Sequence, residues 1–409
     1  MTAPKIEADP AEVGLDPDRL ARVDTHFQRY VDDGRLAGWT IALARHDKLV
    51  HLSHYGLRDV DTDRPVTDDT IWRIYSMTKP ITSVAALMLW ERGLLELTDP
   101  VSRYIPAFAD QRVYRGGSAQ NPGTDAALGP VRVHHLLTHT AGLTYGFHHA
   151  HPVDEMYRSK GYEFGAPAGV DLETAANTFA GFPLLFQPGT EWNYSVATDV
   201  LGRVVEVASG QRLDEFFRTE ILDPLGMADT GFHVPAGDDR LATLYNARPG
   251  GGLVENKALG ASITREPVYL SGGGGLASTV GDYLRFARML ARGGELDGVR
   301  ILGPRTLAHA TRNHLPGDAD LDTIGRPIFS ESAFGGVGFG LGFSVVIDPA
   351  TTKQLANPGT YAWGGLASTA FWVDPVDDVV ATFFTQLVPS STYPIRSQLQ
   401  TLVGQAVIS

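Results

Sequence analysis

The chain has 409 residues, of which 43% are apolar and 20% charged, and it contains no cysteine. The absence of cysteine excludes disulfides, thiolate metal sites, iron–sulfur ligation and a cysteine nucleophile. Its 47 acidic and 34 basic residues give a formal net charge of -13, which argues against nucleic acid or an anionic membrane surface as the main partner.

The start of the chain does not resemble a targeting segment. MTAPKIEADPAEVGLDPDRL lacks a basic stretch followed by an apolar one, so we expect no secretory signal. The most apolar run, residues 84–90, is far too short to cross a bilayer. We therefore expect a soluble, cytoplasmic protein, and its length predicts two lobes or one large domain with an insertion.

Both ends of the chain predict antiparallel hairpins. Residues 40–44 and 49–54 are strand-like and flank a polar turn. Residues 369–373 and 379–384 are rich in β-branched and aromatic side chains and flank an Asp/Pro turn. Such runs, separated by turn residues, are typical of antiparallel strands.

The middle of the chain has a helical pattern. Residues 200–208, 213–222 and 283–291 carry apolar side chains at three- and four-residue spacing. Residues 116–130 and 249–252 are rich in turn-forming residues and are predicted to be loops.

These patterns predict an α+β or α/β sandwich, with an antiparallel sheet flanked by helices. The sheet domain would be discontinuous, formed by residues 1–100 plus 266–409. Residues 101–265 would form a mainly helical lobe inserted between the two parts.

Ser76-Met77-Thr78-Lys79 is the first chemical motif, an S-x-x-K pattern. Residues 81–90 are apolar almost all round, which indicates a helix buried in the core. A helix that begins near Ser76 would put Ser76 and Lys79 on one face, where a partly desolvated lysine can accept the serine proton. On this pattern alone, Ser76 could equally be a plain helix cap.

Two further features narrow that choice. Tyr194-Ser195-Val196 precedes a helical run, so Tyr194 could enter a site from the lobe and share a proton with Lys79 and Ser76. Its alternative is a half-buried packing tyrosine. Trp363-Gly364-Gly365-Leu366 would open the C-terminal strand, where two glycines permit close backbone approach along a cleft; its alternative is a β-bulge.

At this point the chain resembles the class C β-lactamase-like serine hydrolases, and among them the family VIII carboxylesterases. The resemblance covers nearly the whole length. The segments that carry it are S-M-T-K-P at 76–80, L-L-T-H-T-A-G-L at 136–143, P-G at 188–189 ahead of Tyr194, and G-G-G-G-L-A-S-T at 272–279. The family's fold, a sheet flanked by helices plus a helical lobe, agrees with the prediction made from the patterns.

The resemblance also implies roles. Ser76 would be the nucleophile, with Lys79 and Tyr194 as the proton-handling pair. The backbone N–H groups of Ser76 and Leu366 would form the oxyanion hole, a contribution of about 3 kcal/mol per donor in acyl transfer. Tyr145 falls where such esterases often place an aromatic that lines the cleft.

Departures from the β-lactamase pattern bear on the substrate. Trp363-Gly364-Gly365 stands where a β-lactamase would have Lys-Thr-Gly, and Val196 stands where it would have Asn. The cleft thus lacks a cation and an amide that would bind an anionic amide antibiotic. We predict a serine carboxylesterase that hydrolyses small, neutral, relatively hydrophobic esters through an acyl-enzyme, without a cofactor.

Other functions stay open. A β-lactam or D-amino-acid peptide hydrolase, or an acyltransferase, could use the same acyl-enzyme, and an inactive binding protein could keep the same fold. The sequence does not decide whether Lys79 or Tyr194 is the main base, nor the oligomeric state.

The histidines and the glycine-rich run have simpler interpretations. Six of the 13 histidines lie close together but lack zinc-site spacing, so no metal is expected. They are His134, His135, His139, His148, His149 and His151. We predict that His139 is a buried hydrogen-bonding residue. Residues 271–275 lack a phosphate-loop ending and are predicted to lead into a strand.

Overall fold

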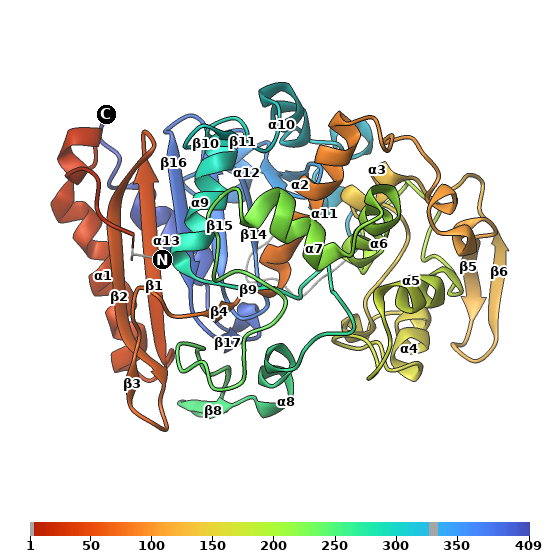
Figure 1. Ribbon diagram of the computed structural model, residues 1–409, viewed down its shortest axis with the longest axis horizontal. Helices are drawn as coiled ribbons and strands as arrows, with labels where there is room; N and C mark the ends of the chain where they lie inside the picture. The colour runs from red at the N-terminus through yellow and green to blue at the C-terminus, as the bar shows by residue number, and fades with distance from the viewer. Residues whose placement is uncertain (1–3, 327–333) are drawn as a thin grey trace.

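The computed structural model describes residues 4–326 and 334–409. Its centre is an eight-stranded antiparallel sheet in the order β12-β13-β14-β15-β16-β1-β2-β3 (Figure 1). The strands are β1 (Gly38–Arg45), β2 (Lys48–Asp59), β3 (Arg64–Pro65), β12 (Val337–Phe339), β13 (Ser344–Val346), β14 (Tyr361–Gly364), β15 (Ala370–Asp374) and β16 (Val379–Phe384). The predicted antiparallel sheet is confirmed.

The two predicted hairpins are adjacent in this sheet. β1 turns into β2 through His46 and Asp47, whose φ angles of 49° and 59° match the two-residue turn that suits right-handed strand twist. β15 and β16 form the second hairpin, and β16 pairs with β1 from Thr40↔Phe384 to Arg45↔Val379. The two ends of the chain therefore form the middle of one sheet.

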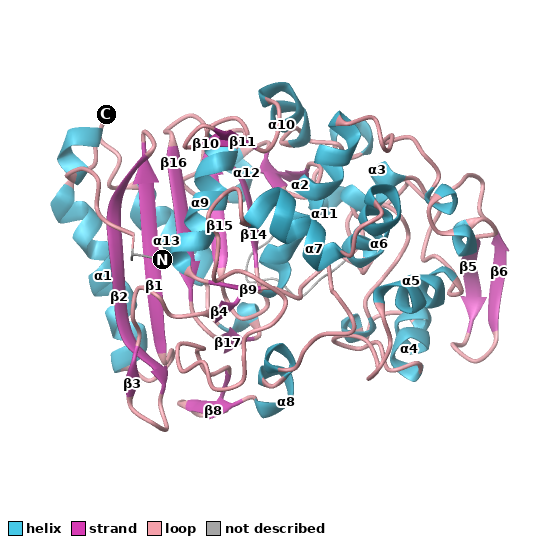
Figure 2. Ribbon diagram, viewed as in Figure 1, coloured by secondary structure: helices cyan, strands magenta, loops and turns pink. Residues whose placement is uncertain are grey.

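Helices cover both faces of the sheet (Figure 2). Ile41 and Leu43 of β1 pack in one cluster with α1 (Pro17–Asp32) and α13 (Ile395–Gly404). Ala42 and Ala44 point the other way, into a cluster with α2 (Thr78–Glu91) and α9 (Val280–Ala291). Because side chains alternate along a strand, all eight residues of β1 are buried between two helical layers.

Helix α2 is the predicted all-apolar helix, and every residue from Thr78 to Leu89 is buried. It begins two residues later than its serine. Ser76 lies in a preceding 3₁₀ turn, η2 (Tyr75–Met77), because the chain enters the helix through a sharp bend at Tyr75.

The part of the chain between the two sheet segments is mostly helical (Figure 1). It contains α3 (Val133–Leu137), α4 (Pro152–Ser159), α5 (Leu172–Ala180), α6 (Ala197–Ser209), α7 (Leu213–Phe217) and α8 (Lys257–Gly260). The helix expected over residues 213–222 is α7 followed by one π turn, Arg218–Leu222. The helices expected at 200–208 and 283–291 fall within α6 and α9.

The loop prediction for residues 116–130 is wrong in part. β5 (Arg112–Gly117) and β6 (Pro122–Ala126) form a hairpin there, paired from Arg112↔Ala126 to Gly117↔Pro122. Their sequence is polar and glycine-rich and has no alternating apolar pattern. These strands form by backbone pairing and not by burial of one face, so periodicity does not reveal them.

Short pairings complete the fold. They are β4 (Trp72–Arg73) with β9 (Ala277–Ser278), β10 (Glu295–Leu296) with β11 (Val299–Arg300), and β17 (Leu387–Val388) with β7 (Tyr245–Ala247), which also pairs with β8 (Leu253–Glu255). The remaining helices are α10 (Pro304–Ala310), α11 (Leu321–Ile324) and α12 (Pro349–Thr352). The division at residues 101 and 265 stays a prediction.

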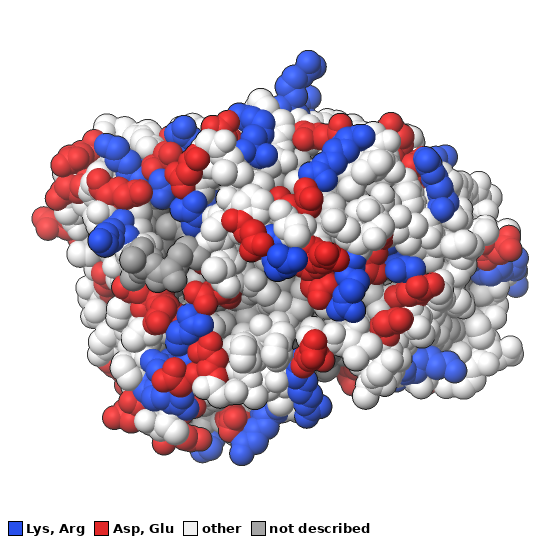
Figure 3. All heavy atoms as spheres, in the orientation of Figure 1, with Lys and Arg blue, Asp and Glu red and all other residues white. Residues whose placement is uncertain are grey.

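Two surface properties are visible in the described residues. None of their helices is both long and apolar enough to span a membrane. Acidic and basic side chains are interspersed over the face of the molecule seen in Figure 3.

Candidate active site

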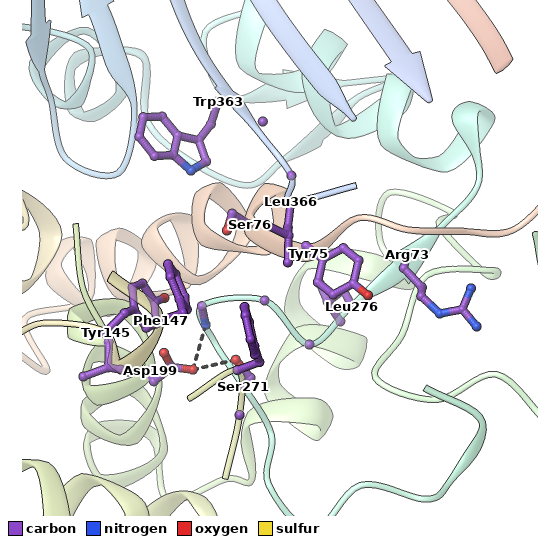
Figure 4. Close-up of a pocket in the computed structure, with 18 of the residues that line it drawn as sticks. Arg73, Tyr75, Ser76, Tyr145, Phe147, Asp199, Ser271, Leu276, Trp363 and Leu366 are labelled. Carbon is purple, nitrogen blue, oxygen red and sulfur yellow. Dashed lines mark hydrogen bonds between the residues drawn. The ribbon is translucent and has the colours of Figure 1, made fainter. Parts of the chain in front are cut away.

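Ser76 lines a cavity with a volume of about 620 Å³. β4 leads into the turn η2, where Tyr75 has a φ of 42°, in the left-handed region that non-glycine residues rarely adopt. This bend places Ser76 immediately before the N-terminus of α2, where the helix dipole favours negative charge. Figure 4 shows Ser76 beside the residues that line the cavity.

The side chain of Lys79 points toward Ser76, as the three-residue spacing of the two residues predicted. Its side chain is 2% exposed. Nζ lies 2.7 Å from the carbonyl oxygen of Gly273, 2.9 Å from the hydroxyl of Tyr145 and 3.4 Å from Oγ of Ser76. The lysine thus connects the serine to two elements from distant parts of the chain.

Tyr145 and Tyr194 occupy different positions around Lys79. The Tyr145 hydroxyl bonds directly to Nζ, whereas the ring of Tyr194 lies with its centroid 4.5 Å from Nζ. The Tyr194 hydroxyl accepts a hydrogen bond from Nε1 of Trp363, at 3.4 Å. Sequence reasoning placed Tyr145 only as a cleft-lining residue, and nothing in its local pattern indicates the lysine contact.

Burial governs the charge state of Tyr145. Desolvation, with smaller contributions from Asp199 and Tyr194, raises the pKa of its hydroxyl well above the ordinary value of 10.0. Tyr145 is therefore a neutral hydroxyl at physiological pH, able to accept a hydrogen bond from the lysine and to donate one.

His139 contacts the segment that carries Tyr194. His139 is 2% exposed and its Nδ1 lies 3.3 Å from Oγ of Ser195, which confirms its predicted role as a buried hydrogen-bonding residue. Its ring centroid is 5.0 Å from that of Tyr194. Burial, and then the charge of Lys79, hold the pKa of His139 well below its usual range, so the ring stays neutral.

Ser76 and Leu366 both line the cavity. Within residues 4–326 and 334–409, the N–H groups of Ser76 and Leu366 donate to no protein acceptor. Figure 4 places Leu366 next to Ser76.

The glycines that precede Leu366 correct one expectation. They end a strand rather than open one: β14 stops at Gly364, and β15 begins only at Ala370, after a turn closed by Gly365 N–H to Thr369 O at 2.9 Å. A Cβ on Gly365 would lie 2.3 Å from the carbonyl oxygen of Ile74, so only glycine lets β14 approach the turn that carries Ser76.

Asp199, in the first turn of α6, is a site residue that sequence reasoning missed. Its buried Oδ1 accepts hydrogen bonds from Oγ of Ser271 at 2.6 Å and from N–H of Gly273 at 3.1 Å (Figure 4). The glycine-rich segment is thereby held so that the Gly273 carbonyl reaches Lys79. A Cβ on Gly273 would lie 2.6 Å from Asp199 Oδ2, which explains the glycine.

The remaining predicted residues also line the cavity. Val196, Trp363 and Gly364 contribute to its wall, and Trp363 packs on Tyr194 with ring centroids 5.4 Å apart. An indole and an isopropyl group thus stand where a cation and an amide would favour an anionic substrate.

The histidine-rich segment is dispersed in space. His134 bonds to His314, His149 pairs with Glu163, and His151 caps α4. The described residues contain no group of three or more His, Asp or Glu side chains that could hold a metal ion.

The fold and this arrangement define a serine hydrolase with a β-lactamase-like architecture. Residues 23–405 match the model of the family described as Beta-lactamase, and the chain belongs to that family.

Similar proteins refine this assignment. The chain is 34% identical to Esterase EstB from Burkholderia gladioli over 392 residues, covering 91% of this chain and 92% of EstB. It matches the solved structure of EstCE1, a hydrolase with promiscuous acyltransferase activity, with a TM-score of 0.80 and 27% identity over 96% of this chain and 99% of EstCE1. It also matches unliganded simvastatin synthase (LovD) from Aspergillus terreus, with a TM-score of 0.81 and 25% identity over 95% and 98% of the two chains. Together these similarities place the chain among the family VIII-like serine hydrolases.

Proposed function

We propose that this protein is a serine carboxylesterase that acts through an acyl-enzyme on Ser76. The observation that carries the proposal is the position of Lys79, 3.4 Å from Oγ of Ser76 and buried, beside two unused N–H groups at one cavity. A nucleophile, an adjacent base and oxyanion donors are the parts that acyl transfer needs.

In the proposed first half-reaction, Oγ of Ser76 attacks the ester carbonyl carbon while its proton passes to the Lys79 amine. The N–H groups of Ser76 and Leu366 stabilise the negative oxygen of the tetrahedral intermediate. The proton then moves to the leaving alkoxide oxygen, the C–O bond breaks, and the alcohol departs. Tyr145 keeps Lys79 hydrogen-bonded, and the Tyr194 hydroxyl, beside Trp363 on the cavity wall, relays the proton.

In the second half-reaction, a water molecule attacks the acyl-Ser76 carbonyl carbon. Lys79 takes the water proton and returns it to Oγ of Ser76 as the acid is released. The same side chains thus serve both halves, first as base and then as acid.

The expected substrates are small, neutral, relatively hydrophobic esters. The wall at Val196 and Trp363 presents an isopropyl group and an indole, and esters need less assistance at the leaving atom than amides do. The similarity to an enzyme named Esterase EstB supports the same choice.

The deciding experiment is the hydrolysis of p-nitrophenyl butyrate by the full chain and by Ser76→Ala. We expect kcat/KM to fall by roughly 10⁴-fold or more while the unfolding temperature is kept, since the nucleophile is lost and packing is not. Ser262→Ala is the matched control, a serine that lines the same cavity. Activity retained by Ser76→Ala would refute the assignment, and peptide mass after labelling with a sulfonyl fluoride should place the adduct on Ser76.

A second candidate is acyl transfer to an alcohol or amine, which the similarity to EstCE1 and LovD favours. An added alcohol that diverts the acyl group from water would identify it. Turnover of a penicillin above that of the ester would instead support the β-lactam alternative.

A further inference from the structure

Arg396 reaches the active site from the other side of the sheet. It lies in the first turn of α13, which packs on the sheet face opposite α2, and its side chain lines the cavity. Its Nη2 donates hydrogen bonds to the carbonyl oxygens of Gly365, at 2.8 Å, and Thr369, at 3.0 Å. Arg396 therefore binds both sides of the turn between β14 and β15.

The glycine at the end of β14 leaves room for this guanidinium. A Cβ on Gly364 would overlap the guanidinium carbon and Nη2 of Arg396. A side chain at this position would therefore push the guanidinium away from the backbone. The two neighbouring glycines thus have separate roles: Gly365 admits the turn that carries Ser76, and Gly364 admits Arg396.

The carbonyl group that Arg396 binds belongs to the same peptide group as the N–H of Leu366. This peptide bond is trans, so its C=O and N–H point in opposite directions. The N–H therefore points away from Arg396, and Leu366 lies next to Ser76 in Figure 4. A guanidinium that fixes the direction of the carbonyl also fixes the direction of the N–H.

The positive charge also affects how strongly this N–H donates. Hydrogen bonds from charged donors are stronger than those from neutral ones, and hydrogen bonds in a chain polarise one another. Because Arg396 draws electron density toward the Gly365 oxygen, the N–H of Leu366 becomes more positive. Such an N–H is a better donor to the oxygen that becomes negative during acyl transfer.

We propose that Arg396 is a positioning residue for the oxyanion hole: it orients and polarises the peptide group whose N–H, that of Leu366, binds the ester carbonyl oxygen in the transition state. It acts through the backbone and not by contact with the substrate. This inference rests on the proposed esterase function and names a residue on which its oxyanion hole depends.

The test compares p-nitrophenyl butyrate with its thionoester, in which sulfur replaces the carbonyl oxygen. Sulfur is a weak hydrogen-bond acceptor, so turnover of the thionoester depends much less on the N–H donors. The readout is the ester-to-thionoester ratio of kcat/KM, corrected for the alkaline hydrolysis rates of the two compounds.

Arg396→Met keeps the aliphatic stem and removes the guanidinium. We expect kcat on the ester to fall on the order of ten-fold, which is a part of the roughly 10²–10³-fold that loss of a whole oxyanion donor costs. KM for the ester should stay unchanged, and the ester-to-thionoester ratio should fall by about the same factor as kcat.

Arg265→Met is the matched control. It removes a cation from the same cavity and leaves the Gly365 carbonyl bonded to Arg396, so the ratio should not change. Gly364→Ala is a second test that keeps the arginine but displaces its guanidinium, and it should lower the ratio as well. In Arg396→Met, the additional change Gly364→Ala should lower the ratio little further, because both changes break the same contact.

Equal losses on ester and thionoester in Arg396→Met would overturn the proposal, because they would mean that Arg396 only supports the fold. A parent enzyme that does not prefer the ester over the thionoester would overturn it too. Failure of the esterase proposal itself would look different: neither compound would be hydrolysed in a Ser76-dependent manner.

Discussion

Lys79 is the residue that the other residues of the site have in common as a contact. Its Nζ contacts Ser76, Tyr145 and Gly273, and it lies over the ring of Tyr194. An amine that is 2% exposed depends on such neighbours for its orientation, because little of its surface is left for water to bond.

Removing one of these partners is the first prediction at this scale. Tyr145→Phe should lower kcat on an ester by about 10²-fold, the low end of what a positioned proton-handling group contributes, because Lys79 loses its hydroxyl partner. The raised pKa of Tyr145 means that its hydroxyl does not ionise below its ordinary value of 10.0. The alkaline limb of the pH–rate profile below that pH should therefore stay where it is.

Stopped-flow or steady-state rates across pH check this. Tyr157→Phe, a buried tyrosine on α4, is the control for loss of a phenol hydroxyl elsewhere. An alkaline limb that moves in Tyr145→Phe would show that Tyr145 itself titrates in the working range.

At the residue scale, the three-residue spacing was sufficient to predict the contact between Ser76 and Lys79, although Ser76 lies in the 3₁₀ turn before the helix. The contact of Lys79 with Tyr145 spans 66 residues and depends on how the segment after α3 returns to α2. Local sequence pattern carries no information on such a return, so Tyr145 and Asp199 could not be assigned their contacts in advance.

At the scale of elements, the end of β14 packs closely against the turn that precedes α2. Gly365 lies where any Cβ would come within 2.3 Å of both the Ile74 carbonyl oxygen and Oγ1 of Thr369. The N–H of Leu366 follows directly, so the spacing of the two elements also sets the proposed oxyanion hole.

Gly365→Ala should therefore push β14 away from the turn at Ser76. We expect kcat to fall on the order of 10²-fold through the displaced Leu366 N–H. The free energy of unfolding should fall by about 1–3 kcal/mol through overpacking.

Denaturant unfolding and ester kinetics measure the two effects. Gly129→Ala is the matched control, since a Cβ there meets open space at a φ that other residues adopt. Unchanged kcat in Gly365→Ala would mean that Leu366 is not an oxyanion donor.

Among the elements, the hairpins and helices with a clear apolar period were predicted well, because burial against a neighbour imposes that period on the sequence. The hairpin β5–β6 and the strand end at Gly364 were not. Both segments are short and glycine-rich. They are strands because their backbones pair, β14 with β15 and β5 with β6, and not because one face is apolar.

On the scale of the whole molecule, strands from the two ends of the chain meet in the middle of the sheet, and Arg45 bonds to residues from both ends. This side chain is 4% exposed. It donates to the carbonyl oxygens of Val13, Gly14, Asp377 and Ser409 at 2.6–2.9 Å.

Arg45→Met keeps the aliphatic stem but removes every one of these donors. We expect the free energy of unfolding to fall by about 2–4 kcal/mol, because charge-assisted hydrogen bonds are lost and buried carbonyls stay unpaired. KM for the ester should not change, since Arg45 is not among the residues that line the cavity.

Equilibrium unfolding in urea provides the measurement, with Arg305→Met as the control at an exposed arginine on α10. Equal stability of Arg45→Met and Arg305→Met would show that the two ends are held by strand pairing alone.

The sequence by itself determined the class of architecture, the buried helix that follows Ser76 and carries Lys79, and the membership of a serine hydrolase group. These follow from periodicity and from short motifs, which act within one or two turns of chain. Only the tertiary structure decided that Tyr145 is the hydroxyl bonded to Lys79 and that Asp199 holds the glycine-rich segment. The physical reason is that contacts between distant segments depend on how the elements pack, and packing is a property of the whole chain.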